Sequence, residues 1–109
     1  MVNINDFSKL DLRIGTIVKA ELLENAKMPA YVLEIDLGKL GIKRSSAQIT
    51  DLYQPNDLVG KQIVAVVNLL PKKIAGITSE VLVLGANNAD RAVVLLEPQK
   101  NIPNGSRVG

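Results

Sequence analysis

Strict alternation of apolar and polar residues dominates the first half of the chain. It runs through residues 12–23 and returns in residues 31–37. Such a period of two is typical of β-strands with one buried face. Gly15 lies inside the first stretch and predicts a bend or bulge, as expected of a strand that serves both halves of a small barrel. A third strand is predicted over residues 42–47.

The second half carries stretches that are apolar at nearly every position, namely residues 62–70, 81–84 and 92–96. Strands buried on both faces need cover beyond the interior of their own barrel. A second copy of the chain is the simplest cover, so the pattern favours a two-fold symmetric homodimer. The alternative is that the terminal segments fold over these strands within one chain.

Short polar segments separate the strands. Residues 5–10 are predicted to form a helical turn capped by Asn5, with Phe7 and Leu10 packed on the barrel end. A second helical turn is predicted over residues 49–53, followed by a loop. The end of the chain, residues 103–105, has the Pro-Asn-Gly sequence of a tight turn.

This order of elements predicts the fold class. At least five closely spaced strands, with one small helix between the third and the fourth, match an all-β, OB-type barrel. The length of 109 residues fits one domain that spans residues 1–109, with no repeat or linker.

Composition narrows the chemistry. The chain has no Cys and no His, which removes disulfides, thiolate ligands, and the commonest general base and metal ligand. A metal site built only from carboxylates would be unusual. We therefore predict a protein that is not an enzyme and uses neither metal nor cofactor.

Net charge and aromatic content restrict the possible functions less than the missing Cys and His do. A net charge of +2 is compatible with an anionic partner but does not identify one. Phe7, Tyr31 and Tyr53 are the only aromatic residues. OB folds that bind any single strand stack several bases on such rings, so a general single-strand binder is not expected. A grip on folded RNA through phosphates is compatible with this composition.

The location is predicted from two absences. The first residues lack the basic and apolar regions of a signal peptide. No apolar run reaches the roughly 18 residues of a membrane span. We expect a cytoplasmic protein with no membrane span.

The candidate RNA contacts are basic residues: Arg13, Lys43, Lys72 and Lys73. Lysines in a loop near a barrel mouth suit phosphate, and Lys72 and Lys73 follow Pro71 in what reads as a loop. The alternatives are an ion pair for Arg13 and simple solubility for the lysines. Lys43 and Arg44 are adjacent on a strand, so they point to opposite faces and do not serve one site.

The candidate peptide contacts are uncharged or acidic: Gln48, Asn68, Ser79 and Glu80. Asn68 interrupts an apolar stretch, so its amide either ties down a neighbouring loop or faces a ligand groove. Ser79 either fixes a turn by bonding backbone or meets ligand donors together with Glu80. Without a base in fixed geometry, the pair is no nucleophile system.

Three motifs resemble one known superfamily. Asp11-Leu12-Arg13-Ile14-Gly15 is similar to the opening strand of the tRNA-binding-domain superfamily of OB folds. The stretch from Asn68 to Gly76 resembles its Asn-Leu-x-Pro segment, and Ser79-Glu80 resembles the start of its Ser-Glu-Gly-Met signature. The resemblance implies a five-stranded Greek-key barrel whose terminal extensions form a homodimer.

Two departures point to a subgroup of that superfamily. Residues 25–31 carry one residue more than the Asn-Ala-Asp-Lys-Leu-Tyr stretch typical of the RNA binders, and Val81-Leu82 replaces Gly-Met. Both features, and the sequence of residues 45–50, are similar to the CsaA-type chaperones. That similarity implies an ATP-independent cytoplasmic chaperone that binds unfolded preproteins and works with the Sec translocation motor.

Two functional hypotheses therefore remain. The first is an export-related chaperone that holds extended segments in a groove of the homodimer. The second is a structure-specific tRNA-binding protein that contacts phosphates through its basic residues. A weaker third possibility is a scaffold that docks onto a synthetase or translocase subunit.

Overall fold

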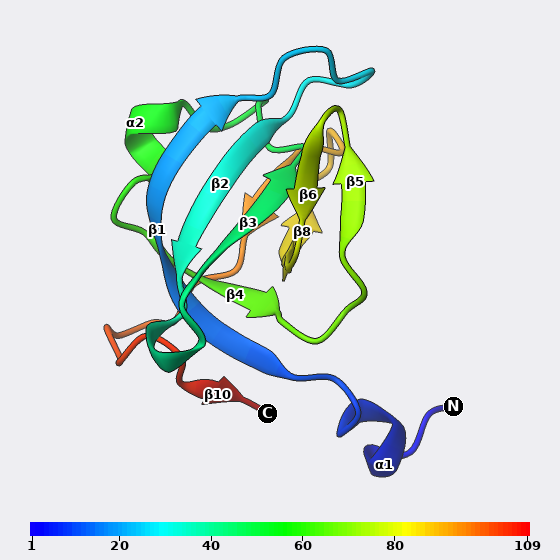
Figure 1. Ribbon diagram of the computed structural model, residues 1–109. Coiled ribbons are helices and arrows are strands. Elements are labelled where there is room, and N and C mark those ends of the chain that lie inside the picture. Colours follow the sequence, from blue (N-terminus) through cyan, green and yellow to red (C-terminus); the bar gives the residue numbers. More distant parts are fainter.

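The barrel is built from one antiparallel sheet that curls on itself (Figure 1). The computed structural model describes residues 1–109. Strands neighbour one another in the order β3–β2–β1–β4–β7. Their bounds are Leu12–Leu22 for β1, Tyr31–Asp36 for β2, Ile42–Ala47 for β3, Gln62–Val66 for β4 and Leu82–Val83 for β7. The all-β, OB-type prediction is confirmed, including the three strands of the first half.

Shorter helices and strands complete the structure around this barrel. The helices are α1 (Ile4–Phe7), the 3-10 turn η1 (Gly38–Leu40) and α2 (Pro55–Leu58); the remaining strands are β5 (Lys72–Ile74), β6 (Ile77–Ser79), β8 (Gly85–Asn87), β9 (Val93–Leu95) and β10 (Arg107–Val108). Strands β5 and β6 pair as a hairpin, as do β8 and β9. Strand β10 pairs with the start of β1, not with its sequence neighbour. None of the helices is long and apolar enough to cross a membrane.

Strand β1 bends so that it can pair with three partners. Its first half pairs with β4 and β10 and its second half with β2. The register shifts between Ile17 and Lys19. A bulge reverses the alternation of faces, so Ile17 is fully buried while Val18 is 42% exposed. The simple alternation predicted for residues 12–23 is therefore wrong beyond the bend.

The barrel interior holds a single apolar cluster. Its members are Ile17, Tyr31, Leu33, Ile35, Leu37, Ile49, Leu58, Ile63, Ala65, Val81 and Leu95. Helix α2 contributes Leu58, which is completely buried. The predicted helical turn at residues 49–53 is a non-helical turn instead, and the helix lies in the segment predicted as a loop. Pro55 suits the first helical turn, and the Gln54 N–H donates to the Asp57 carboxylate at 3.1 Å.

Side chains close the barrel between β3 and residues 79–81. The carbonyl of Arg44 accepts the backbone N–H of Glu80 at 2.8 Å. The Arg44 N–H in turn donates to Glu80 Oε1 at 3.1 Å, and the Ser46 N–H donates to Ser79 Oγ at 3.1 Å. We call this contact the seam. The Val81 N–H also donates to the Arg44 carbonyl, at 3.4 Å, so two of the four bonds use side-chain oxygens in place of a strand's carbonyls.

Helix α1 projects away from the barrel with the N-terminus at its tip (Figure 1). Its cap is Asn3, whose side chain accepts the Asp6 N–H at 3.0 Å, and not the predicted Asn5. None of its residues is buried. Phe7 and Leu10 are 43% and 40% exposed, so the prediction that they pack on the barrel end is wrong.

The apolar stretches of the second half are only partly covered. Strand β4 ends at Val66, and Leu70 beyond it is 93% exposed. Leu82, Val94 and Leu96 are also exposed. The terminal segments of the same chain therefore leave these side chains open to solvent.

A substitution at Gly15 tests the importance of the bend in β1. A Cβ atom at this position would lie 2.5 Å from Ile35 Cγ2 and 2.7 Å from Leu37 Cδ2, both in the core. We expect Gly15→Ala to lower the free energy of unfolding by about 1–3 kcal/mol through overpacking. Urea unfolding with an unchanged slope would measure it. Val18→Ala, on the exposed side of the same strand, should change stability by less than about 0.5 kcal/mol; equal effects of the two substitutions would contradict the account.

Candidate functional site

Four hollows follow one another over the surface beside the seam. Their volumes are about 330, 610, 250 and 300 Å³. Successive hollows share lining residues: Glu80 joins the first to the third, Lys72 the third to the second, and Met28 the second to the fourth. We call the four together the track. Because neighbours share lining residues, the four hollows lie next to one another in a row along the surface.

The position of the track follows from how the barrel closes. On its outer side β3 forms backbone hydrogen bonds to residues 79–81 only through the Arg44 carbonyl; the Ser46 N–H is taken by Ser79 Oγ, and no backbone N–H of residues 79–81 reaches the Ser46 carbonyl. Ser46 lines two of the hollows. The loop between β1 and β2 forms one wall and the β5–β6 hairpin the other. A strand carbonyl without a backbone partner, lying between two walls, can accept a hydrogen bond from an extended chain.

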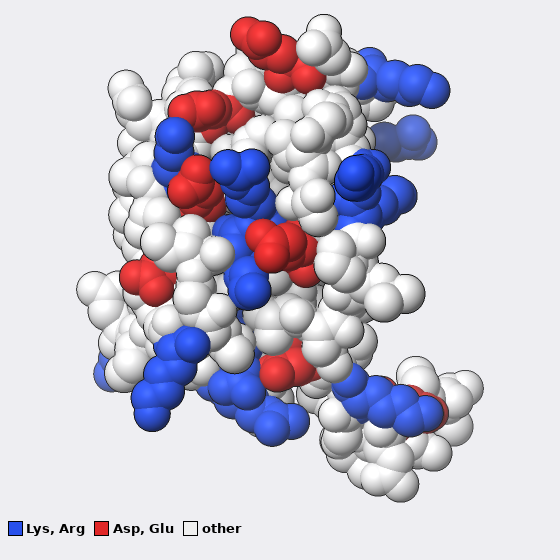
Figure 2. All heavy atoms as spheres, in the orientation of Figure 1, with Lys and Arg blue, Asp and Glu red and all other residues white.

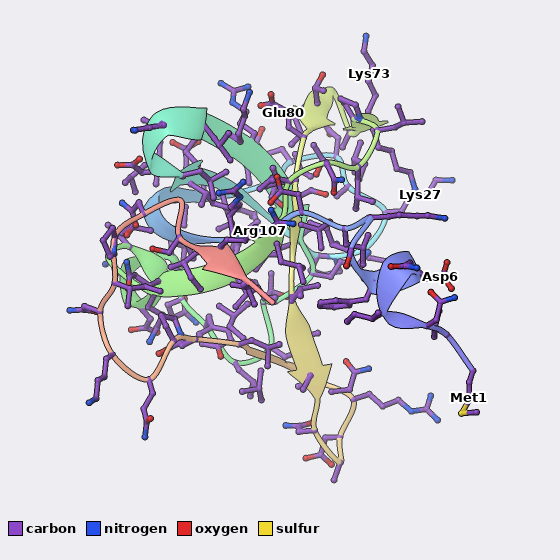
Figure 3. All side chains as sticks on the ribbon, turned by 90° about the horizontal axis from the view of Figure 1, so that it is seen from below. Met1, Asp6, Lys27, Lys73, Glu80 and Arg107 are labelled. Carbon is purple, nitrogen blue, oxygen red and sulfur yellow. The ribbon has the colours of Figure 1, made fainter.

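The largest hollow, of about 610 Å³, is basic and partly apolar. Lys27, Lys72 and Lys73 line it together with Met28 and Ile74, and no carboxylate does. None of the three lysines forms an ion pair. Lys27 and Lys73 extend outward from the molecule (Figure 3). Figure 2 shows basic side chains along the upper right edge, over the β1–β2 loop and the β5–β6 hairpin.

Gln48 is the predicted peptide contact with the clearest access to this hollow. It follows the end of β3, is exposed, and lines both the 610 Å³ and the 300 Å³ hollows. Its side chain makes no hydrogen bond within the protein, unlike those of Asn68, Ser79 and Glu80. An unpaired amide at the junction of two hollows can donate to and accept from a ligand backbone.

Asn68 lies at the other end of the track, in the 330 Å³ hollow. Although it is exposed, both ends of its amide are used: Oδ1 accepts the Asp11 N–H and Nδ2 donates to the Lys9 carbonyl, each at 2.8 Å. The side chain therefore ties the segment after α1 to the end of β4. Of the two roles considered for Asn68, the structure displays the tie to a neighbouring segment.

Glu80 and Lys43 line the same hollow and face each other. The Lys43 Nζ lies 3.8 Å from Glu80 Oε2, while Glu80 Oε1 holds the seam. The Ser79 hydroxyl oxygen likewise accepts one of the hydrogen bonds of the seam. These three residues border the track, but their polar groups already have partners within the chain. Arg44 does not line this hollow, in keeping with the opposite directions expected of adjacent strand residues.

Arg13 lies outside the track. It bonds both oxygens of Asp11, with its Nε 2.6 Å and its Nη2 3.3 Å away, and its Nη1 donates to the Gly105 carbonyl at 3.0 Å. We call Asp11, Arg13 and Gly105 the clasp, because they fasten the C-terminal segment to β1. The structure thus separates the four predicted RNA contacts: only Lys72 and Lys73 share the basic hollow.

The clasp perturbs a carboxyl group. The hydrogen bond from Arg13 lowers the pKa of Asp11 below its ordinary value of 3.8, against a smaller opposing effect of burial. The positive charges of Arg13 and Arg107 act in the same direction as the hydrogen bond. The same contact raises the pKa of the Arg13 guanidinium.

Sequence reasoning missed two members of the track and misplaced two others. Neither Lys27 nor Met28 was among the predicted RNA or peptide contacts. Lys72 and Lys73 lie on β5, paired with Ser79 and Thr78, and not in a loop. The turn of this hairpin is Ala75-Gly76, with positive φ at both residues, and of the two only Gly76 is a turn signal in the sequence.

Comparison with known proteins agrees with this geometry. The family described as a putative tRNA binding domain matches residues 12–107. The chain therefore belongs to the tRNA-binding domain family. A methionine–tRNA ligase of Methanococcoides burtonii is 37% identical over 106 residues, but the chain spans only 15% of that ligase.

Two solved structures narrow the assignment within the family. The chaperone CsaA of Bacillus anthracis is 56% identical, with a TM-score of 0.94 over 100% of this chain and 99% of that one. The CsaA chaperone protein of Picrophilus torridus is 46% identical, also with a TM-score of 0.94 and with 100% of both chains covered. The chain is a CsaA-type member of the family.

Acid should loosen the clasp. Because the folded-state pKa of Asp11 is depressed, its stabilising contribution is present above 3.8 and is lost as pH falls through the folded value. We expect Asp11→Asn to lower the urea midpoint near neutral pH and to have little effect well below pH 3.8. Urea titrations of both proteins at the two pH values measure the difference. A deficit of the variant that stays constant with pH would contradict the assignment.

Proposed function

We propose that the protein is an export-related chaperone that binds unfolded preproteins in the cytoplasm, with the track as its binding site. It holds extended segments and performs no chemistry. The observation that carries the proposal is the row of four adjoining hollows beside β3 and the β5–β6 hairpin. The CsaA chaperones, similar over nearly their whole length, support the same function.

The walls suit an unfolded chain better than a folded ligand. Met28 and Ile74 offer apolar contact for side chains, and Met in particular adapts to varied partners. Gln48 and the edge of β3 offer hydrogen bonds to the backbone, which every sequence has. Recognition of backbone and apolar character, and not of one sequence, is what a chaperone for many preproteins needs.

Binding should depend on the apolar wall. We expect the double substitution Met28→Ser and Ile74→Ser to weaken binding of a labelled unfolded preprotein segment roughly tenfold or more, because about 1.4 kcal/mol of apolar contact is lost. Fluorescence anisotropy of the segment measures the affinity.

The matched control is Val18→Ser, which also removes an exposed apolar side chain but lies outside the track. It should bind as the unchanged protein does. Unchanged affinity of the double variant, with its fold intact, would remove the track as the site.

A second candidate, structure-specific tRNA binding, rests on the basic hollow. Three lysines without carboxylate partners line this hollow, and long cationic side chains that extend outward can reach phosphates. The family match supports it as well. In this reading the phosphate contacts are Lys27, Lys72 and Lys73, while Arg13 and Lys43 stay in their ion pairs.

The salt dependence of tRNA binding tests this candidate. Each phosphate contact adds about one to the slope of log affinity against log salt. We expect Lys27, Lys72 and Lys73, all changed to Ala, to reduce that slope by about three. The triple change Lys19, Lys39 and Lys100 to Ala removes the same charge away from the track and should leave the slope nearly intact. Equal slopes for the two triple variants would exclude a phosphate site in this hollow.

We further propose that two copies assemble through α1. Ile4, Phe7 and Leu10 leave an apolar arm in water, and Leu69 and Leu70 leave an apolar loop. Figure 2 shows the arm as a lobe of mostly uncharged residues. A homodimer would cover these surfaces and set two tracks in one particle, with the Sec translocation motor as a downstream partner of the complex.

Light scattering coupled to size exclusion tests the arm. We expect Phe7→Ser with Leu10→Ser to halve the measured mass, because the helix loses its apolar contacts with the partner. Val59→Ser, at an exposed apolar residue beside α2, is the control and should keep the mass of the unchanged protein. A monomeric mass for the unchanged protein would refute the homodimer.

A further inference from the structure

The C-terminal segment turns sharply at Pro103-Asn104-Gly105-Ser106. The Ser106 N–H donates to the Pro103 carbonyl at 3.1 Å, and Gly105 has a φ of 86°. A positive φ at the third residue is what a type II turn requires, and glycine supplies it at little cost. The turn was predicted from the sequence, but none of the functions above uses it.

Asn followed by Gly is also a chemically reactive pair. The backbone nitrogen of the glycine can attack Cγ of the asparagine, because no Cβ shields it. A bond forms between that nitrogen and Cγ, and the bond from Cγ to Nδ2 breaks. Nδ2 leaves as ammonia with the proton lost by the backbone nitrogen. Water then opens the five-membered ring at either carbonyl, giving aspartate or isoaspartate.

The folded structure holds both reacting groups in place. The Gly105 N–H donates to the Ile14 carbonyl at 2.6 Å, so the attacking nitrogen is engaged. Asn104 Oδ1 accepts from Thr16 Oγ1 at 2.7 Å and from Gln62 Nε2 at 3.2 Å, so the side chain cannot rotate freely toward that nitrogen. The reaction needs these bonds to break together.

We propose that Asn104 is a deamidation site that the docked C-terminal segment protects and that local opening of this segment exposes. Several hydrogen bonds dock it, and all of them lie near the end of the chain. They include the clasp bond from Arg13 to the Gly105 carbonyl and the bond from the Ile14 N–H to the Ser106 carbonyl at 2.9 Å. Chain ends held this way open locally far more often than the core does.

Aspartate and isoaspartate at position 104 differ in whether the docked C-terminal segment can accommodate them. Aspartate keeps the oxygen that Thr16 and Gln62 contact, and both of these donate, so a carboxylate is accepted there. Isoaspartate lengthens the main chain by one carbon. The Asn104 carbonyl packs tightly on Gly38, where an added Cβ would lie 3.0 Å from the carbonyl carbon. The longer chain cannot keep this contact and the Gly105 bonds together, so formation of isoaspartate releases the segment irreversibly.

The rate of deamidation tests the proposal. The full-length protein, an Arg13→Ala variant and a synthetic peptide of residues 99–109 are incubated in mildly alkaline buffer, and proteolytic mapping by mass spectrometry quantifies aspartate and isoaspartate at position 104. We expect the full-length protein to react at least about tenfold more slowly than the peptide, with the variant in between. A rate within about twofold of the peptide would overturn the protection.

Two further measurements distinguish local opening of the C-terminal segment from a general loss of the fold. Hydrogen exchange of the Gly105 amide reports opening of the segment in each protein. A variant whose amide exchanges faster but whose deamidation does not would overturn the coupling. Asn104→Asp represents the product that fits, and its urea midpoint should equal that of the unchanged protein. A clear loss of stability would overturn the assignment of products.

Discussion

The seam between β3 and residues 79–81 is the contact on which both the fold and the site depend. Without it the sheet would remain open, and the apolar cluster around Leu33 and Ile63 would face water. It closes through Glu80 and Ser79 side chains and one backbone carbonyl, that of Arg44. A continuous ladder would have sealed the outer edge of β3. Closure by side chains leaves no backbone pairing between Ser46 and residues 79–81, and two hollows of the track lie beside Ser46.

This arrangement explains why residues singled out from the sequence divide into two groups. Asn68 attracts notice because it interrupts an apolar stretch, and Ser79 and Glu80 because they resemble a family signature; in the structure the polar groups of all three bond the chain itself. The side chains of Gln48, Lys72 and Lys73 line the basic hollow and make no hydrogen bond or ion pair within the chain. The second group is therefore the one available to the proposed ligand. The sequence alone does not separate the two groups of residues, because they differ in which backbone groups the fold brings close to each side chain.

Much of the fold could be predicted from the sequence, because alternation reports a half-buried strand directly. Strands β1 and β2 were found in this way. The small helix expected between the third and fourth strands is present as α2, but its bounds were wrong, since a four-residue helix has no apolar period and its signal is only Pro55 with a carboxylate two residues later. The β5–β6 hairpin was not predicted, because nothing in the sequence indicates that Ala75 adopts a positive φ. The hollow itself unites residues from distant segments, such as Lys27 and Lys73, and no local pattern encodes that meeting.

The central claim is that the track, and not another face, receives an extended chain. Amide chemical-shift mapping during titration with an unfolded preprotein segment tests it most directly. The account predicts that the largest shifts lie along the outer edge of β3 at Ser46 and Gln48 and on the walls at Met28 and Ile74. Binding of the segment with shifts confined to other surfaces, such as α2 or the β8–β9 hairpin, would contradict it.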